Sequence, residues 1–358
     1  MAALKTFRFL VFPVFFLMIY VGAASCRNSS ASEPDGCNSV YFWKTSFSPN
    51  DYEKEFLKNH NVKKLYVRFF DVDMDWESTG RDNIAPKATI QFKDTVPPGM
   101  EIVPTVYITN SAIEAMQLKE EEFAGRIFKR VNAMCRRNGF ELTELQLDCD
   151  WTKHTQKYFF KLCDELKLLM DSTQTISSTI RLHQLTQTPP PVDKGVLMVY
   201  NTGNLMEMTT DNSIFSLKDI KPYLRDDRLS KYPLPLDIAY PAYGWSLVFR
   251  LGNDGYQFDR IMRRTDFSSY PGLKRIGNNT YEATEDIDFS TDSTDWDKVY
   301  EKYRIRVERP TAKDILEVKK MIDKQLANKP HNNILYHLDE SQLSHYSDYE
   351  INKIYSRD

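Results

Sequence analysis

The sequence predicts an α/β protein, a (β/α)8 TIM-type barrel. Short apolar segments with the period of β-strands alternate with amphipathic segments that have the period of helices, and this order is typical of a parallel sheet covered by helices. Eight such strands spread over roughly 300 residues suit a closed barrel better than an open sheet. No glycine-rich phosphate-binding loop follows any of these strands, which disfavours an open nucleotide-binding sheet.

The strands and helices are placed by hydrophobic periodicity and by the residues that flank each segment. The predicted strands are 40–45, 64–70, 101–109, 145–150, 176–183, 196–200, 236–245 and 333–338. The predicted helices are 49–59, 119–138, 154–171, 217–227, 310–327 and 347–355. Ser48 precedes the first helix, Gly139 follows the second, and Pro310 suits a first helical turn.

Two stretches depart from the regular alternation. Residues 184–195 contain Pro189, Pro190 and Pro191, which are incompatible with a normal helix, so the fifth helix is predicted to be missing or collapsed. Residues 247–303 are long, polar and rich in Gly, Asn and Asp, which is unusual for a connecting loop. We predict that they form an insertion with some hairpin content between strands seven and eight.

The N-terminus has the composition of an export signal. Lys5 and Arg8 precede an apolar run over residues 9–21, which is short for a membrane span, and small residues then lead to Cys26. This arrangement resembles a bacterial lipobox and predicts a signal peptide over 1–25, a lipidated Cys26 and a flexible tether over 26–38. A single barrel domain over 39–358 would follow, anchored to the cell envelope. A plain secretory signal cleaved at the small residues is the alternative, giving a secreted or periplasmic protein.

Composition limits the classes of partner. The formal net charge of −3 gives no basic face, so no nucleic-acid partner is expected. Four further cysteines are Cys37, Cys135, Cys149 and Cys163, and their spacing matches no metal motif, so neither a metal nor a cofactor is predicted. We expect buried thiols, with disulfides as the alternative in an exported chain. Oligomeric state is not predicted.

The segment that ends the fourth predicted strand is the strongest functional signal. Asp148 and Asp150 are separated by one residue, so they point to the same side of a strand while Cys149 points to the other. Two carboxylates on one face would repel each other in a dry core, which indicates that the strand ends in a solvated site. Arg181, on the neighbouring strand, is the expected cation for this pair. The same contact is also compatible with a purely structural role.

Polar and aromatic side chains recur at nearly every strand end, where function resides in this fold. The predicted ligand-binding set is Trp43, Asp75, Trp76, Tyr107, Trp151, Arg181, His183, Tyr200, Asn201, Tyr240, Tyr243 and Trp245. This pattern predicts one aromatic-lined cleft suited to a sugar. Alternatives remain open: Asp71, Asp73 and Asp75 suit a calcium loop or a solvated loop, and His183 and His337 suit barrel packing.

The fourth-strand sequence resembles the chitinase-type glycosidase signature, in which Asp-x-Asp-Trp-Glu closes strand four of a (β/α)8 barrel. Asp148, Asp150 and Trp151 match the pattern. More broadly, the chain is similar to glycoside-hydrolase-like barrels among exported bacterial lipoproteins. Thr152 stands where the signature has its acid/base glutamate, and a threonine does not donate a proton to a glycosidic oxygen.

The leading hypothesis is therefore an exported, membrane-anchored glycoside-hydrolase-like protein that acts on a carbohydrate. If it is catalytic, two carboxylates flank the scissile bond, with Asp150 as nucleophile or base positioned by Asp148. The expected proton donors are Asp237, Glu340 and Asp75, in that order. The alternative is a non-catalytic glycan-binding lipoprotein. A metal-dependent deacetylase is less consistent with the sequence, because His183 and His337 lack a His-x-x-x-His spacing.

Overall fold

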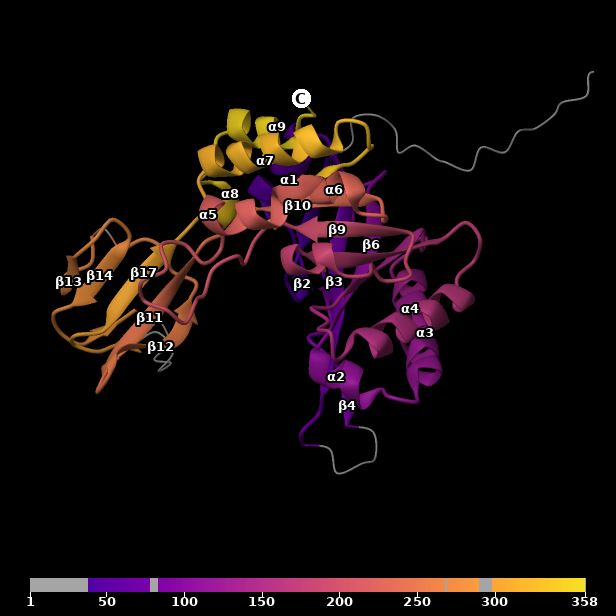
Figure 1. The fold of residues 1–358 in the computed structure, drawn as a ribbon, viewed down its shortest axis with the longest axis horizontal. Coiled ribbons are helices and arrows are strands. Elements are labelled where there is room, and N and C mark those ends of the chain that lie inside the picture. The colour runs from indigo at the N-terminus through magenta and orange to yellow at the C-terminus, as the bar shows by residue number, and fades with distance from the viewer. Residues whose placement is uncertain (1–37, 78–82, 268, 290–297, 358) are drawn as a thin grey trace, which may run out of the picture. The chain divides into compact units, whose positions relative to one another are not determined.

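The computed structural model describes residues 38–77, 83–267, 269–289 and 298–357 (Figure 1). The predicted signal peptide, Cys26 and nearly all of the predicted tether lie outside these residues, so their placement stays a prediction. Within the described part of the chain, no helix combines the length and the apolar character that a membrane crossing requires.

Eight parallel strands close into a barrel. They are β1 (Asn38–Phe42), β3 (Val62–Met74), β6 (Glu101–Ile108), β7 (Glu144–Asp148), β8 (Thr175–Arg181), β9 (Lys194–Met198), β10 (Leu236–Pro241) and β18 (Asn333–Tyr336). Closure is shown by β1, because Val40 lies opposite Leu65 of β3 on one side and Leu335 of β18 on the other. The predicted fold class is confirmed, and each predicted strand overlaps one of these eight.

The helices pack outside the strands, with α3 and α4 along one side of the barrel in Figure 1. They are α1 (Asp51–Asn59), α2 (Asn110–Ala115), α3 (Glu120–Arg137), α4 (Gln156–Leu169), α5 (Leu217–Ile220), α6 (Arg228–Lys231), α7 (Ala312–Leu326), α8 (Glu340–Leu343) and α9 (Asp348–Tyr355). Capping residues explain where two of these helices begin: Asn50 and Glu53 form a reciprocal capping box at the N-terminus of α1, and Thr311 caps the N-terminus of α7. The predicted helix 217–227 is instead α5 followed by the 3-10 helix η2 (Lys221–Asp227).

The predicted loss of the fifth helix is confirmed. After β8 the chain forms only a 3-10 helix, η1 (Leu182–Thr186), before it passes through Pro189, Pro190 and Pro191 to β9. The side-chain amide of Gln184 donates to the carbonyl of Trp151 at 2.9 Å. This contact ties the short connection to the end of β7, where the predicted site lies.

The insertion between β10 and β18 is an antiparallel sheet in the order β12-β11-β17-β14-β13. Its strands are β11 (Trp245–Gly252), β12 (Gly255–Met262), β13 (Leu273–Arg275), β14 (Thr280–Ala283) and β17 (Arg304–Glu308). The sheet has a small core of its own that includes Val248, Met262, Phe267, Phe289 and Ile305. Hairpin content was predicted for this stretch, and the sheet extends slightly beyond the predicted ends.

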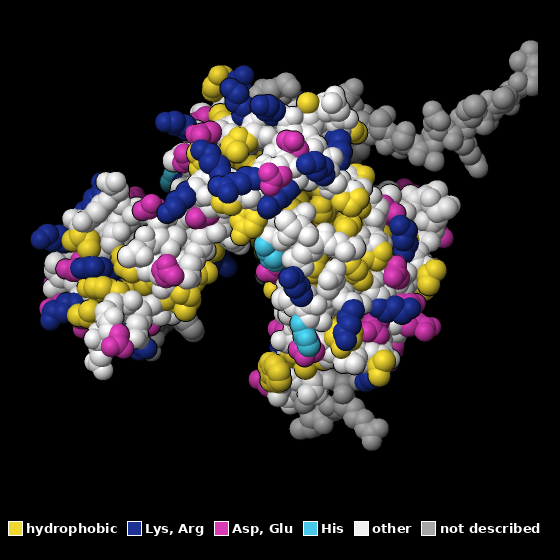
Figure 2. Space-filling model, in the orientation of Figure 1, with side chains coloured by type: hydrophobic (Ala, Val, Ile, Leu, Met, Phe, Trp, Pro, Cys, Tyr) yellow, Lys and Arg dark blue, Asp and Glu magenta, His cyan; other side chains and the backbone are white. Residues whose placement is uncertain are grey.

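Three short pairings complete the strands. β4 (Ile84–Lys87) pairs antiparallel with the second half of β3, while β2 (Ser46–Phe47) pairs with β5 (Gln91–Phe92). β15 (Ile287–Asp288) pairs with β16 (Lys298–Val299). On the face shown in Figure 2, acidic and basic side chains are interspersed, as expected for a chain of nearly balanced charge.

A buried ionic network occupies the N-terminal end of the barrel. Glu144, only 2% exposed, lies 2.9 Å from the ammonium of Lys64 and 3.1 Å from that of Lys194, and the hydroxyl of Ser177 donates to it at 2.6 Å. Burial opposes ionisation of Glu144, but the two lysines and the hydroxyl outweigh it, so its pKa lies below the usual value.

Asp237 belongs to this same end of the barrel. Its carboxylate lies 3.4 Å from Lys194 and accepts from the backbone N–H of Asn332 at 2.7 Å. Asp237 was the first-ranked proton donor in the sequence analysis, and that assignment is wrong. It is the second residue of β10, so it lies near the start of the strand, whereas the predicted site lies at the strand ends.

The network predicts a large stability effect at Glu144. Glu144→Gln leaves two buried or half-buried ammonium groups without their shared carboxylate, so the free energy of unfolding should fall by roughly 3–5 kcal/mol at pH 7. Because the folded pKa is lowered, the advantage of the natural protein is full above the unfolded value of about 4.3 and is lost as the pH falls below it. Urea unfolding at pH 7 and pH 3.5 measures both effects. Glu141→Gln, at an exposed position, is the control, and equal losses in the two variants would contradict the prediction.

Candidate functional site

The C-terminal end of the barrel, which we call the mouth, brings polar groups from adjacent strands into one row. In the sheet register, Asp71 of β3 lies opposite Tyr107 of β6, and Tyr107 lies opposite Asp148 of β7. Asp71 and Tyr107 are half-buried, and Asp148 is buried. Burial, followed by the nearby Asp148, raises the pKa of Tyr107, so its phenol remains a hydrogen-bond donor at neutral pH.

Asp148 is held by two donors from β8. The hydroxyl of Thr179 donates to Oδ1 at 2.7 Å, and Nη2 of Arg181 donates to the same oxygen at 3.0 Å. Burial opposes the charge of Arg181, but Asp148 outweighs it and raises the pKa of the guanidinium. The predicted pairing of Arg181 with this acid is present.

Asp150 has a different environment from Asp148. Its side chain is 55% exposed, and Oδ1 lies 3.9 Å from Nε of Arg181 and 3.8 Å from Nε2 of His183, which is also exposed. These distances exceed hydrogen-bond length. Of the two acids, Asp150 is therefore the one that faces solvent and is accessible to a ligand.

A second pair of opposite charges lies across the mouth. Nε of Arg68 donates to Oδ1 of Asp71 at 2.6 Å, and Nη2 donates to Oδ2, so the contact is bidentate. The guanidinium of Arg68 also lies 5.5 Å from the ring centre of Trp43, within cation–π range. Trp43, a predicted ligand-binding residue, is half-buried here beside a fixed cation.

Tyr336 of β18 is the centre of an aromatic cluster at the mouth. Its ring centre lies 5.7 Å from Trp43, 5.1 Å from Tyr200 and 5.6 Å from Tyr243. Tyr336 is half-buried, and burial raises its pKa. The sequence analysis did not select Tyr336. The alternation of side chains along β18 could have indicated it, because Tyr336 lies two residues after Ile334 and therefore on the same face of the strand.

The predicted residues Tyr243, Asn201 and Trp245 extend this cluster. The Tyr243 hydroxyl donates to Oδ1 of Asn201 at 2.7 Å, and the Tyr243 ring lies 5.6 Å from the half-buried indole of Trp245. Nε1 of Trp245 donates to the buried Glu308 at 2.8 Å. Glu308 also accepts from Arg306 at 2.7 Å and from Ser213, so the insertion strand β17 is bonded to the segment that follows β9.

Two predicted ligand-binding aromatics do not belong to the mouth. Trp151 is fully buried and its ring lies 5.3 Å from Phe160 of α4, because it continues the outward-facing side of the chain that also holds Cys149. Tyr240 is fully buried, and burial, followed by the charge of Asp323 on α7, raises the pKa of its phenol. Both assignments are wrong for the same reason, since side-chain alternation directs these residues toward the surrounding helices.

The remaining predicted residues lie on the rim. Trp76 is 76% exposed after the end of β3, and the half-buried Asp75 precedes it. Glu340 is exposed at the start of α8, where it accepts from the side-chain amide of Asn50 at 2.8 Å. Thr152 is exposed, and its hydroxyl lies 3.3 Å from that of Thr155 at the start of α4.

The acids in the second half of β3 have protein partners in the structure. Asp71 pairs with Arg68, and Asp73 accepts from the hydroxyl of Thr109 at 2.9 Å. Among the described residues, no three His, Cys, Asp or Glu side chains are grouped as they would be around a metal ion. The three cysteines in this part of the chain, Cys135, Cys149 and Cys163, are free buried thiols.

Comparisons with known proteins place the fold. No family model matches the chain, and no curated protein matches it by sequence. A class V chitinase from Nicotiana tobaccum superposes with a TM-score of 0.52 at 10% identity, over 89% of this chain and 97% of that one. The spore cortex-lytic enzyme SleL of Bacillus cereus gives 0.51 at 12% identity, over 89% of this chain and 74% of that one.

A third structure is the GH18 chitinase from Cycas revoluta in complex with (GlcNAc)3, with a TM-score of 0.51 at 13% identity, over 89% of this chain and 98% of that one. At such low identities the similarity is one of fold. The chain thus has the closed (β/α)8 barrel of chitinase-like structures.

Because Asp148 and Asp150 have different environments, replacing each with asparagine should change the free energy of unfolding by different amounts. Asp148→Asn removes the buried partner of Arg181, so we expect the free energy of unfolding to fall by roughly 3–5 kcal/mol. Asp150→Asn changes an exposed acid, so we expect a change within about 0.5 kcal/mol. Chemical denaturation of the two variants beside the natural protein measures both. If Asp148→Asn lowers the free energy of unfolding no more than Asp150→Asn does, the prediction that the buried Asp148–Arg181 contact stabilises the mouth is contradicted.

Proposed function

We propose that the barrel mouth binds an oligosaccharide and that the protein is a glycan-binding relative of the glycoside hydrolases. The observation that carries this proposal is the aromatic cluster around Tyr336, which lies beside fixed polar groups. Trp43, Tyr200 and Tyr243 lie within 6 Å of the Tyr336 ring centre, and two of the four, Trp43 and Tyr336, are only half-buried. Flat rings offer apolar surface to a sugar ring, while Asp150, Asn201 and Tyr107 offer hydrogen-bonding groups to its hydroxyls.

We favour binding over two-carboxylate hydrolysis because the two leading candidate proton donors, Asp237 and Glu340, are held in other contacts. Asp237 lies at the opposite end of the barrel, and Glu340 is exposed on the rim and bonded to Asn50. Thr152 has no carboxyl group, and Asp148 is occupied by Arg181 and Thr179. A glycosidase that uses the two-carboxylate mechanism needs a carboxylic acid near the leaving oxygen and a second carboxylate across the bond.

The solved structures with the same fold suggest the first ligands to test. They include chitinases and a cortex-lytic enzyme, and one chitinase is in complex with (GlcNAc)3. We therefore propose oligomers that contain N-acetylglucosamine as the first class of ligand. Peptidoglycan fragments and neutral polysaccharides complete the panel.

The test combines binding and turnover in one preparation. Residues 36–358, purified without the N-terminal segment, are titrated calorimetrically with (GlcNAc)3 to (GlcNAc)6 and with the panel, and reducing ends are measured after prolonged incubation. We expect binding without release of reducing ends. Trp43→Ala should weaken binding at least tenfold, about 1.4 kcal/mol, because it removes a stacking surface. Tyr349→Ala, at an exposed aromatic residue on α9 outside the predicted site, is the control, and thermal unfolding checks that both variants fold.

Two outcomes would contradict the proposal. Released reducing ends that disappear in Asp150→Asn would establish the hydrolase hypothesis instead. Absence of binding to every glycan in the panel, with a folded protein, would remove the carbohydrate assignment.

The cellular location forms a second part of the proposal. We propose an exported protein that is anchored to the cell envelope by a lipid on Cys26, with the mouth available to external glycans. The support is the sequence pattern of residues 1–26, which comprises a positive start, an apolar run and small residues before the cysteine.

Cys26→Ala tests the anchor in the full-length chain. Loss of the thiol removes the attachment site, so we expect the variant in the soluble or unprocessed fraction and without incorporated labelled palmitate. Cys135→Ala, which removes a thiol from the folded domain, is the control and should leave lipidation unchanged. Continued palmitate incorporation into Cys26→Ala would contradict lipid attachment at this residue.

A further inference from the structure

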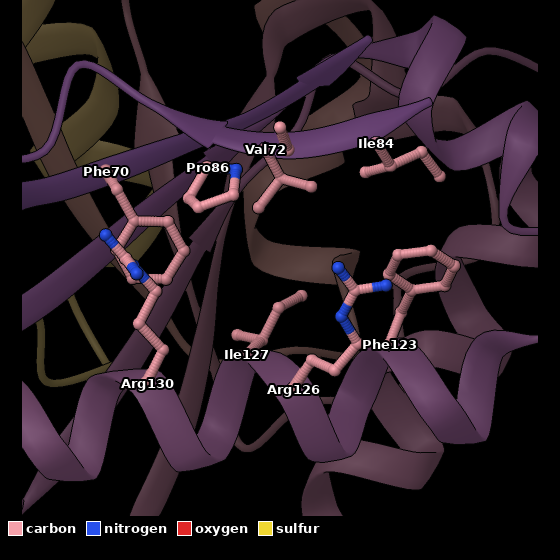
Figure 3. A pocket seen from close by; sticks show the side chains of 9 residues that line it. Phe70, Val72, Ile84, Pro86, Phe123, Arg126, Ile127 and Arg130 are labelled. Carbon is pink, nitrogen blue, oxygen red and sulfur yellow. The ribbon is translucent and has the colours of Figure 1, made fainter. Parts of the chain in front are cut away.

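A hollow on the outside of the barrel has a composition unlike that of the mouth. It lies between the β3–β4 hairpin and helix α3 and has a volume of about 190 Å³ (Figure 3). Its walls are apolar, with Phe70 and Val72 from β3, Ile84 and Pro86 from β4, and Phe123 and Ile127 from α3. It shares no residue with the mouth.

Two arginines flank this apolar space. Arg126 and Arg130 lie one turn apart on α3, so they share a helix face, and Figure 3 shows their side chains rising from the helix on either side of Ile127. The guanidinium of Arg126 lies 4.7 Å from the ring centre of Phe123, and that of Arg130 lies 5.0 Å from Phe70. Each cation thus lies against an aromatic ring that lines the hollow.

The positive charge of the two arginines is only weakly compensated among the described residues. Arg126 lies 3.7 Å from Glu122, and both side chains are about half exposed, so the pair is weak. Arg130 donates through Nη2 to the Thr89 hydroxyl at 2.9 Å, while its buried Nε has no protein partner. A buried donor without a partner is costly, so the hydrogen-bonding capacity of this guanidinium is not fully used by the protein.

The hollow continues along the helix. A second hollow of about 600 Å³ shares Arg130 and is lined by the segment 89–92 and by Met134, Arg137 and Asn138. The two hollows meet at Arg130, whose side chain reaches across to Thr89, and we call them together the trough; α3 is one wall of each, and residues 84–92 supply the other. From Arg126 to Arg137 the helix rises about 16 Å, which equals the length of about five extended residues.

We propose that this trough binds an extended acidic peptide segment of a partner protein, with one apolar side chain in the hollow and carboxylates on Arg126 and Arg130. Charge complementarity identifies the acid, because both flanking groups are cations and the enclosed walls are apolar. The volume identifies the anchor: about 190 Å³ suits one large side chain and is below the roughly 300–1,000 Å³ typical of small-molecule sites. A central apolar anchor with arginines beside it is a common arrangement at protein interfaces.

This proposal is independent of carbohydrate binding. Arg68 and Asp71 of β3 form their ion pair at the mouth, while Phe70 and Val72 of the same strand line the hollow. A partner in the trough and a glycan at the mouth would therefore occupy opposite faces of one strand. Failure of either assignment leaves the other untouched.

The test uses residues 36–358 and a set of blocked, fluorescently labelled pentapeptides in which one apolar residue, Leu, Ile, Met, Phe or Tyr, is flanked by two glutamates on each side. Anisotropy titrations at low salt should show binding for at least one peptide, with an alanine-centred peptide at least tenfold weaker. The double variant Arg126→Gln/Arg130→Gln should weaken binding at least tenfold. Arg136→Gln, an exposed arginine on the same helix outside the trough, should not. Added salt should weaken binding, since the contact is ionic.

Three results would overturn the inference. These are no binding by any peptide in the set, equal binding by the double variant and the Arg136→Gln control, or equal affinity for the alanine-centred peptide. Phenylpropionate is tested in parallel, and displacement of the peptide at equal concentration would assign the trough to small carboxylic acids instead. Circular dichroism and thermal unfolding verify that all variants fold, so loss of binding is not mistaken for loss of structure.

Discussion

Closure of the barrel imposes one constraint on the rest of this molecule: polar groups that a strand turns inward are cut off from water and depend on partners across the interior. Strand β7 shows the constraint most clearly, because its alternate residues Glu144, Gln146 and Asp148 all point inward. Glu144 meets Lys64 and Lys194, Gln146 accepts from the Tyr41 hydroxyl at 2.8 Å, and Asp148 meets Thr179 and Arg181. An unpaired group at any of these layers would cost several kcal/mol.

These three layers have different consequences. The lowest layer, around Glu144, contributes stability, because its charges are buried and joined to lysines from β3 and β9. The uppermost layer, around Asp148, fixes Arg181 at the mouth, beside the exposed Asp150 and the half-buried rings of Trp43 and Tyr336. An acid held by a cation from another strand is thus found at both ends of the barrel.

The outer faces of the strands carry a separate set of roles. Trp151, Cys149 and Tyr240 pack against helices, while Phe70 and Val72 leave a hollow between β3, β4 and α3. The second half of β3 pairs with β4, from Asp71 opposite Lys87 to Met74 opposite Ile84, and this hairpin forms one wall of the hollow. Because β3 belongs to the barrel and also pairs with β4, this one strand contributes both to the mouth and to the hollow on the outside of the barrel.

Periodicity in the sequence was enough to predict the fold class, the eight strands, the collapsed fifth helix and Arg181 as the cation for the Asp148 and Asp150 pair, because each depends on local alternation or on residues one strand apart; the structure shows that Asp148 is the closer partner. It also indicated Trp43, Tyr107, Tyr243 and Trp245 as strand-end aromatics, and the structure places all four at the mouth.

Only the tertiary structure decided where along and across a strand each residue lies. Asp237 and Tyr243 were both assigned to the end of strand seven, yet Asp237 lies at its start and joins the Lys194 network. Trp151 and Tyr240 fit an aromatic pattern but face helices, and the centrality of Tyr336 depends on three rings from other strands. The period of the sequence specifies which residues share a face of a strand. The strand boundaries and the closure of the barrel specify at which end of the barrel each residue lies and which residues of other strands it contacts.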